Sequence, residues 1–437
     1  MISWLSSRHN RSRIFGWVSL VMSFAAVQAL VQVLSILTGF VLVRHLTKED
    51  YAWFTIASGM TAGLSILADS GIGSAVTSLA GSVWENGKRL ADLMAAALCA
   101  RVRSSALAVV LLLPTTFYLL CRNHAPVLTA VVITVLVVLP LGWVTRISVL
   151  TVVNRMHHRT REIQIAELAA ASSRSVFTIL PTVMGYGSAI VAMGAMCVSH
   201  WFQARMVKRQ VEPLLVHGAA MPDEEDFAPR IRRIMRQMLP SCLFVAFQGQ
   251  LSIMLISVFA SNSQVADLGA LTRLGIVFTI AGAPMAQLVP PRIAKCQSAR
   301  RLGWMIGLVA GAYAVFASGV LCLIYFESGW FLWLLGPAYA HLHHELLLVT
   351  VAASLGGMNS AMWCMNFARG WTRYAWLNVP VSLVLQVVGV LVFRVDTVAG
   401  VAMMVIVVCS GQLLHSVGVA ICGLRSVFRQ TSKKIYS

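Results

Sequence analysis

Apolar segments of about twenty residues recur from one end of this 437-residue chain to the other. Each segment is long enough to cross a hydrocarbon layer about 30 Å thick as a helix. Hydrophobic residues make up 58% of the chain and charged residues only 11%, whereas a soluble domain has roughly 25% charged residues. These features exclude a soluble globular fold. We therefore expect an all-α, polytopic membrane protein.

Hydropathy predicts twelve membrane spans. The first six lie at about 17–43, 52–78, 104–121, 127–150, 164–185 and 187–204, and the second six at about 240–261, 268–290, 303–326, 345–367, 375–393 and 398–422. A longer polar segment separates the two sets. We therefore predict an N-terminal six-helix half (1–204), a cytoplasmic linker (205–239), a C-terminal six-helix half (240–424) and a cytoplasmic tail (425–437).

The lysine and arginine residues predict the orientation of the spans. If the N-terminus is cytoplasmic, 27 of the 34 lysine and arginine residues fall in cytoplasmic segments, four fall on the opposite side and three lie inside spans. Cytoplasmic loops of membrane proteins carry such an excess of positive charge. The asymmetry predicts that both termini are cytoplasmic.

Composition and motifs also exclude several functions. The formal net charge is +18, but the basic residues fall in alternate loops rather than in one patch, so no nucleic-acid partner is expected. The nine cysteines are scattered without CxxC spacing, which predicts neither a disulfide framework nor a metal site. The sequence has no nucleotide-binding loop, nucleophile elbow or HExxH motif, so we expect no enzyme, no catalytic residues and no cofactor.

Three short motifs stand at the ends of predicted spans. They are Arg44-x-Leu46 followed by Asp50-Tyr51-Ala52, then Leu67-x-Asp69-x-Gly71, and finally Leu334-x-Gly336 followed by Tyr339. These motifs and the layout of the spans resemble those of Wzx-type polysaccharide flippases. In the first motif Ala52 stands where that family has glycine.

This resemblance implies a fold, a substrate and a location. The family belongs to a superfamily that also contains multidrug extruders and lipid II flippases, so the two six-helix halves are expected to be MATE-like. The implied substrate is an undecaprenyl-pyrophosphate-linked oligosaccharide, carried across the bacterial inner membrane for O-antigen, capsule or exopolysaccharide synthesis. The implied partners are membrane lipids, a polysaccharide polymerase and a chain-length regulator. The implied mechanism is alternating access of the two halves.

Three arginines inside the predicted spans are candidates for substrate binding, namely Arg146, Arg174 and Arg273. A charged residue at the centre of a bilayer costs at least about 2.5 to 3.5 kcal/mol, so such residues mark functional sites by default. A guanidinium stays charged and can bind phosphate oxygens in a bidentate fork. We predict that the three arginines line a cationic cavity between the halves. The alternative is that some of them extend to a membrane interface or pair with an acid.

Two carboxylates are candidates for coupling transport to an ion gradient, namely Asp69 and Glu167. Asp69 precedes Ser70 and Gly71, where the second span is expected to break. Its carboxylate could therefore bind a proton or sodium ion, or cap the following half-helix. Glu167 lies two helical turns before Arg174, so a structural pair with that arginine is the alternative for Glu167.

The sequence leaves two other functions open. An ion-coupled multidrug exporter of the same superfamily should carry acidic residues in its spans to attract cationic drugs, whereas this chain carries arginines. A membrane glycan polymerase or ligase should have a large external loop with catalytic residues, but the longest external segment, about 327–344, is short.

Overall fold

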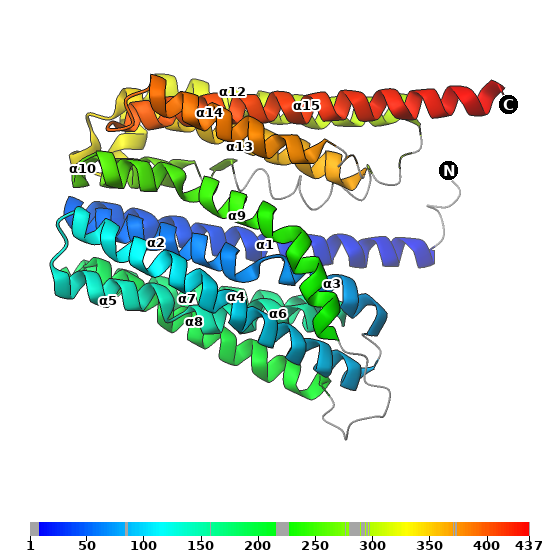
Figure 1. Ribbon diagram of the computed structural model, residues 1–437, viewed down its shortest axis with the longest axis horizontal. Coiled ribbons are helices and arrows are strands. Elements are labelled where there is room, and N and C mark those ends of the chain that lie inside the picture. The colour runs from blue at the N-terminus through cyan, green and yellow to red at the C-terminus, as the bar shows by residue number, and fades with distance from the viewer. Residues whose placement is uncertain are drawn as a thin grey trace. The chain divides into compact units, whose positions relative to one another are not determined.

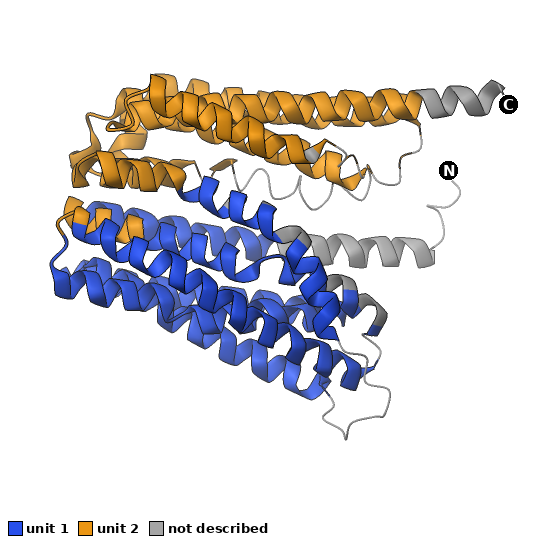
Figure 2. Ribbon diagram, in the orientation of Figure 1, with its two compact units in different colours: residues 1–46, 57–121, 125–250 blue, residues 47–56, 122–124, 251–437 orange. Residues whose placement is uncertain are grey.

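The computed structural model describes residues 8–83, 86–157, 159–215, 227–275, 277–278, 289, 293, 296, 298–369, 371 and 374–436 (Figure 1). These residues form helices joined by short turns and contain no β-strand. The predicted all-α fold is confirmed. The helices pack into two compact units, coloured separately in Figure 2.

The N-terminal unit comprises residues 1–46, 57–121 and 125–250. Its helices are α1 (Arg8–His45), most of α2 (Lys48–Asp69), α3 (Ile72–Val83), α4 (Gly87–Arg122), α5 (Val127–Val138), α6 (Leu141–Met156), α7 (Thr160–Pro181), α8 (Ala189–Val211) and the first part of α9 (Phe227–Phe259). Helix α7 packs on α1 and α8, α8 also packs on α5 and α6, and α3 packs on α6. A buried cluster joins six of these helices; its members include Ile72, Leu90, Val153, Ala166, Val207 and Ile231.

The C-terminal unit comprises residues 47–56, 122–124 and 251–437. It holds the first residues of α2, the end of α9, α10 (Asn262–Leu274), α12 (Ala299–Leu335), α13 (His343–Ala368), α14 (Asn378–Val392) and α15 (Val398–Tyr436). Helix α15 packs on α13 and α14, and α13 also packs on α10 and α12. Leu302, Ile306, Met362, Met365 and Ala420 are buried together in this unit.

By length and composition, eight helical segments of the described chain can cross a membrane. They are Ala26–His45, Lys48–Asp69, Gly87–Arg122, Val127–Met156, Cys242–Phe259, Ala299–Leu335, His343–Ala368 and Val398–Phe428. Helices α7, α8 and α14 lie at the fifth, sixth and eleventh predicted spans, and α10 begins the eighth, much of which lies outside the described residues. Many large apolar side chains are exposed, as a lipid-facing surface requires. The chain is a multi-pass membrane protein.

The predicted division at residues 204, 239 and 424 stays a prediction. Helix α9 runs without interruption from Phe227 to Phe259, and the boundary between the two compact units falls within it, after Gln250. Residues 216–226 of the predicted linker lie outside the described residues.

Gly269 allows α10 to lie close to the start of α2. A Cβ atom at this position would overlap Oγ1 of Thr55 and would lie 2.7 Å from its Cγ2. We therefore expect Gly269→Ala to lower the free energy of unfolding by about 1 to 3 kcal/mol, the usual cost of overpacking a buried contact. The measurement is the unfolding midpoint of the purified protein in detergent.

The matched control for this change is Gly307→Ala on α12. A Cβ atom at Gly307 meets nothing within 4 Å, and alanine has the higher helix propensity. The control should therefore leave the midpoint unchanged or raise it slightly. Equal midpoints for the two variants would show that α10 and α2 do not need this close approach.

Candidate functional site

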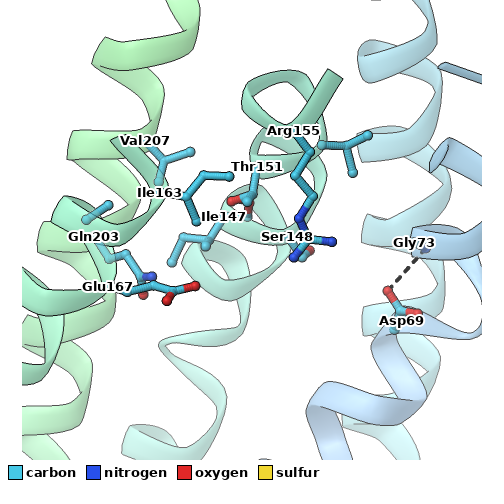
Figure 3. A pocket seen from close by; sticks show the side chains of 12 residues that line it. Asp69, Gly73, Ile147, Ser148, Thr151, Arg155, Ile163, Glu167, Gln203 and Val207 are labelled. Atoms are coloured by element: carbon cyan, nitrogen blue, oxygen red, sulfur yellow. Dashed lines mark hydrogen bonds between the residues drawn. The ribbon is translucent and has the colours of Figure 1, made fainter. Parts of the chain in front are cut away.

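A cavity of about 730 Å³ lined by both polar and apolar side chains lies within the N-terminal unit. It is lined by residues from the α2–α3 region, α6, α7 and α8, and its polar side chains are Asp69, Ser148, Thr151, Arg155, Glu167 and Gln203. Figure 3 shows Glu167 and Gln203 together on one side and Asp69 on the other. The structure thus brings both predicted ion-coupling candidates to one cavity, together with Arg155, which lies between the fourth and fifth predicted spans.

Asp69 is fixed by a break in the second predicted span. Ser70 and Gly71 have positive φ angles of 43° and 82°, which ends α2 and lets α3 start in a new direction. The Asp69 carboxylate accepts a hydrogen bond from the backbone N–H of Gly73 over 3.3 Å. It therefore caps the first turn of α3, one of the two roles considered for it.

Asp69 also forms an ion pair that the sequence did not reveal. Its carboxylate lies 2.7 Å from Nη1 of Arg101 on α4, whose side chain is only 4% exposed. The neighbouring Ser104 hydroxyl donates to the Ala68 carbonyl over 2.7 Å. These contacts attach α4 to the end of α2, so the charge of Asp69 is balanced on one side and faces the cavity on the other.

Glu167 and Arg174 both bind side chains of α1. The Glu167 carboxylate accepts a hydrogen bond from Nε2 of Gln28 over 2.6 Å, and Nη2 of Arg174 donates to the Ser35 hydroxyl over 2.6 Å. Helix α1 therefore positions both Glu167, a candidate for ion coupling, and Arg174, a candidate for substrate binding.

The other two candidate arginines have different surroundings. Arg146 is exposed on α6 and lines a second, smaller cavity of the N-terminal unit. Arg273 belongs to the C-terminal unit, where its Nε donates to the Tyr51 hydroxyl over 3.4 Å and its guanidinium lies 5.5 Å from the centre of the Phe54 ring. The predicted common cavity for the three arginines stays a prediction.

Lys48, which lies between Leu46 and Asp50 of the first motif, meets Tyr339 of the third motif in the C-terminal unit. The ammonium of Lys48 lies 3.0 Å from the Asp267 carboxylate, donates to the Ser263 hydroxyl over 3.2 Å and lies 5.2 Å from the centre of the Tyr339 ring. Asp267 is 2% exposed. The pair therefore ties the start of α2 to α10 beside the turn that precedes α13.

The fold is that of known membrane transporters. Solved structures that match include an inward-facing multidrug resistance MATE family transporter of the MOP superfamily, with a TM-score of 0.69, 15% identity and coverage of 93% of this chain and 99% of that one. The lipid II flippase MurJ in an inward closed conformation matches with a TM-score of 0.71 and 10% identity over 93% of this chain and 90% of MurJ.

A third match is a MOP superfamily transporter from Pyrococcus furiosus, described as having a binding pocket of reversed polarity. It has a TM-score of 0.62 and 14% identity, over 92% of this chain and 94% of that one. No protein-family model and no curated protein sequence matches the chain. At these identities the likeness shows the fold alone, so the chain has the fold of MOP superfamily transporters.

Proposed function

We propose that this protein is a flippase that moves an undecaprenyl-pyrophosphate-linked oligosaccharide across the bacterial inner membrane for surface polysaccharide synthesis. The observation that carries this proposal is the charge of the spans. Asp69 and Glu167 are acidic, and the basic residues are Arg101, which pairs with Asp69, Arg174 on α7 and Arg273 on α10. An excess of positive charge favours an anionic head group such as a pyrophosphate.

Arginine suits this task because two of its N–H groups can bind two phosphate oxygens at once. The hydrogen bond from Arg174 to Ser35 orients its guanidinium, and Tyr51 and Phe54 hold that of Arg273. In this proposal each guanidinium contacts pyrophosphate oxygens during transport, and transport proceeds by alternating access of the two halves.

The fold supports a lipid-linked substrate, because one protein that shares it is a lipid II flippase. The proposed partners are membrane lipids, a polysaccharide polymerase and a chain-length regulator, since a flipped repeat unit must be polymerised on the far side of the membrane. Consumption of the product there, the membrane potential or an ion gradient would drive transport.

A multidrug exporter is the second candidate function, and Glu167 is the observation that favours it. This carboxylate lines the 730 Å³ cavity and hydrogen-bonds to the neutral amide of Gln28. A carboxylate facing a cavity inside the spans can attract a cation. Multidrug transporters also share the fold. The two candidate functions therefore differ in the residues that bind the substrate. A flippase would use the arginines to bind an anion, and a multidrug exporter would use Glu167 to bind a cation.

Deleting the gene should distinguish the two functions. We expect undecaprenyl-linked oligosaccharide to accumulate and surface polysaccharide to be lost, because the repeat unit remains on the cytoplasmic side. Wild-type protein should restore both pools. Arg174→Ala, present at the normal level, should restore neither, since it cannot bind the pyrophosphate. The measurement is lipid extraction with quantification of both pools.

Arg394→Ala is the matched control for this experiment. Arg394 is 82% exposed and pairs with Asp396 in the loop before α15, so its removal changes the charge by the same amount without touching the spans. It should restore both pools. Unchanged lipid and polysaccharide pools in a deletion strain that has no redundant flippase would reject the proposal and favour the drug exporter.

A further inference from the structure

The second cavity of the N-terminal unit combines positive charge with aromatic side chains. It has a volume of about 340 Å³ and lies between α6 and α8. Its charged residues are Arg146, Arg205, Lys208, Arg209 and Glu212, and its aromatic residues are Trp143 and Trp201. Four basic groups thus face one acid. This volume is within the range of about 300 to 1,000 Å³ that is common for small-molecule sites.

The cavity lies at the predicted cytoplasmic end of its helices. Lys208 and Arg209 are in the last turn of α8, in a segment that the charge asymmetry places on the cytoplasmic side. Trp201 lies ten residues before Val211, the last residue of α8, or about 15 Å along the helix axis. The cavity therefore runs from the level of the cytoplasmic head groups toward the apolar layer.

Exposed apolar side chains continue this surface deeper into the membrane. On α8, Val198 is 42% exposed, Trp201 43% and Phe202 41%. The guanidinium of Arg205 lies 5.5 Å from the centre of the Trp201 ring. This cation–π contact holds the guanidinium where the basic cavity meets the exposed apolar side chains of α8. A molecule that fits both the basic cavity and the apolar surface of α8 carries negative charge at one end and hydrocarbon at the other.

The geometry points to a binding site for the phosphate of an anionic phospholipid of the cytoplasmic leaflet. The basic side chains would contact the phosphate, and the acyl chains would lie along the exposed apolar side chains of α8. Basic pockets between membrane helices on the cytoplasmic side bind anionic head groups in this way. This site is separate from the 730 Å³ cavity and does not depend on what the protein transports.

The test measures lipid binding to the purified full-length protein by native mass spectrometry, with phosphatidylglycerol, zwitterionic phosphatidylethanolamine and undecaprenyl diphosphate as probes. Phosphatidylglycerol should bind more tightly than phosphatidylethanolamine. Arg205→Gln/Arg209→Gln should weaken phosphatidylglycerol binding at least about tenfold, because each basic residue near the surface contributes about 1 kcal/mol. A second pair, Arg146→Gln/Lys208→Gln, should weaken it similarly.

The control pair is Arg300→Gln/Arg301→Gln at the start of α12. Both residues are exposed in a predicted cytoplasmic segment, so the control removes the same charge from another place and should leave phosphatidylglycerol binding unchanged. Equal losses in the control and the cavity variants would show that net charge alone attracts the lipid, and would overturn the site. If the cavity variants lost only undecaprenyl diphosphate binding, the site would belong to a polyprenyl substrate rather than to a phospholipid.

Discussion

Replacing Lys48 with methionine is expected to lower the free energy of unfolding by about 3 to 5 kcal/mol, because it leaves a buried carboxylate without its counter-charge. Asp267 is 2% exposed, so its carboxylate depends on the ammonium of Lys48 for its counter-charge. The Ser263 hydroxyl donates to Asp267 only over 3.5 Å. The measurement is a denaturant titration of the purified protein in detergent.

Three further variants show whether burial is the cause of this loss. Arg394→Met breaks the exposed Arg394–Asp396 pair, and its midpoint should not change. Asp267→Asn should be milder than Lys48→Met, because the ammonium that remains reaches water. The double variant Lys48→Met/Asp267→Asn should recover most of the loss, since no buried charge remains. A Lys48→Met protein as stable as Arg394→Met would contradict the buried pair.

The sequence predicted the spans well because hydropathy is a property of one segment at a time. The predicted span at 303–326 lies inside α12, which extends from Ala299 to Leu335. At its start the helix continues through Arg300 and Arg301, which end an apolar window but not a helix. At its end a further helical segment follows a kink at Glu327, which has a φ of -117° and a ψ of 30°. The break after Asp69 was also predictable, since Gly71 adopts a φ of 82° that favours glycine.

The candidate site was predictable only in part. Asp69 and Glu167 stood out because carboxylates are rare in apolar windows, and both line the 730 Å³ cavity. Arg101 and Arg155 fall outside the predicted spans, so hydropathy did not mark them as candidates. Their contacts depend on which helices pack together, and no local pattern contains that information. The same limit applies to Arg146, since hydropathy does not say which face of α6 it occupies.

The structure shows a contact between two of the sequence motifs that the resemblance did not predict. Lys48 lies between Leu46 and Asp50 of the first motif, Tyr339 belongs to the third and Asp267 directly precedes the predicted eighth span. In the fold Lys48 contacts both the Asp267 carboxylate and the Tyr339 ring. These three side chains are more than 70 residues apart in sequence, so no local pattern could have joined them.

Asp69→Asn is expected to destabilise the protein by about 3 to 5 kcal/mol, because the Arg101 guanidinium is then left uncompensated in a buried position. The Arg101 side chain is 4% exposed, against 36% for Asp69. The asparagine oxygen can still accept the hydrogen bond from the Gly73 N–H, so the loss reports the missing charge and not the missing cap. The measurement is again a denaturant titration in detergent.

The double variant Asp69→Asn/Arg101→Met separates a structural role of Asp69 from ion coupling. Removing both charges should restore most of the stability, because a buried ion pair can be replaced by uncharged residues at little cost. If Asp69 serves only to hold α4 and cap α3, this folded variant should also restore surface polysaccharide in the deletion strain, and we expect that result. A folded variant that restores none would show that the Asp69–Arg101 pair takes part in transport beyond holding α4, and would favour ion coupling over a purely structural role for Asp69.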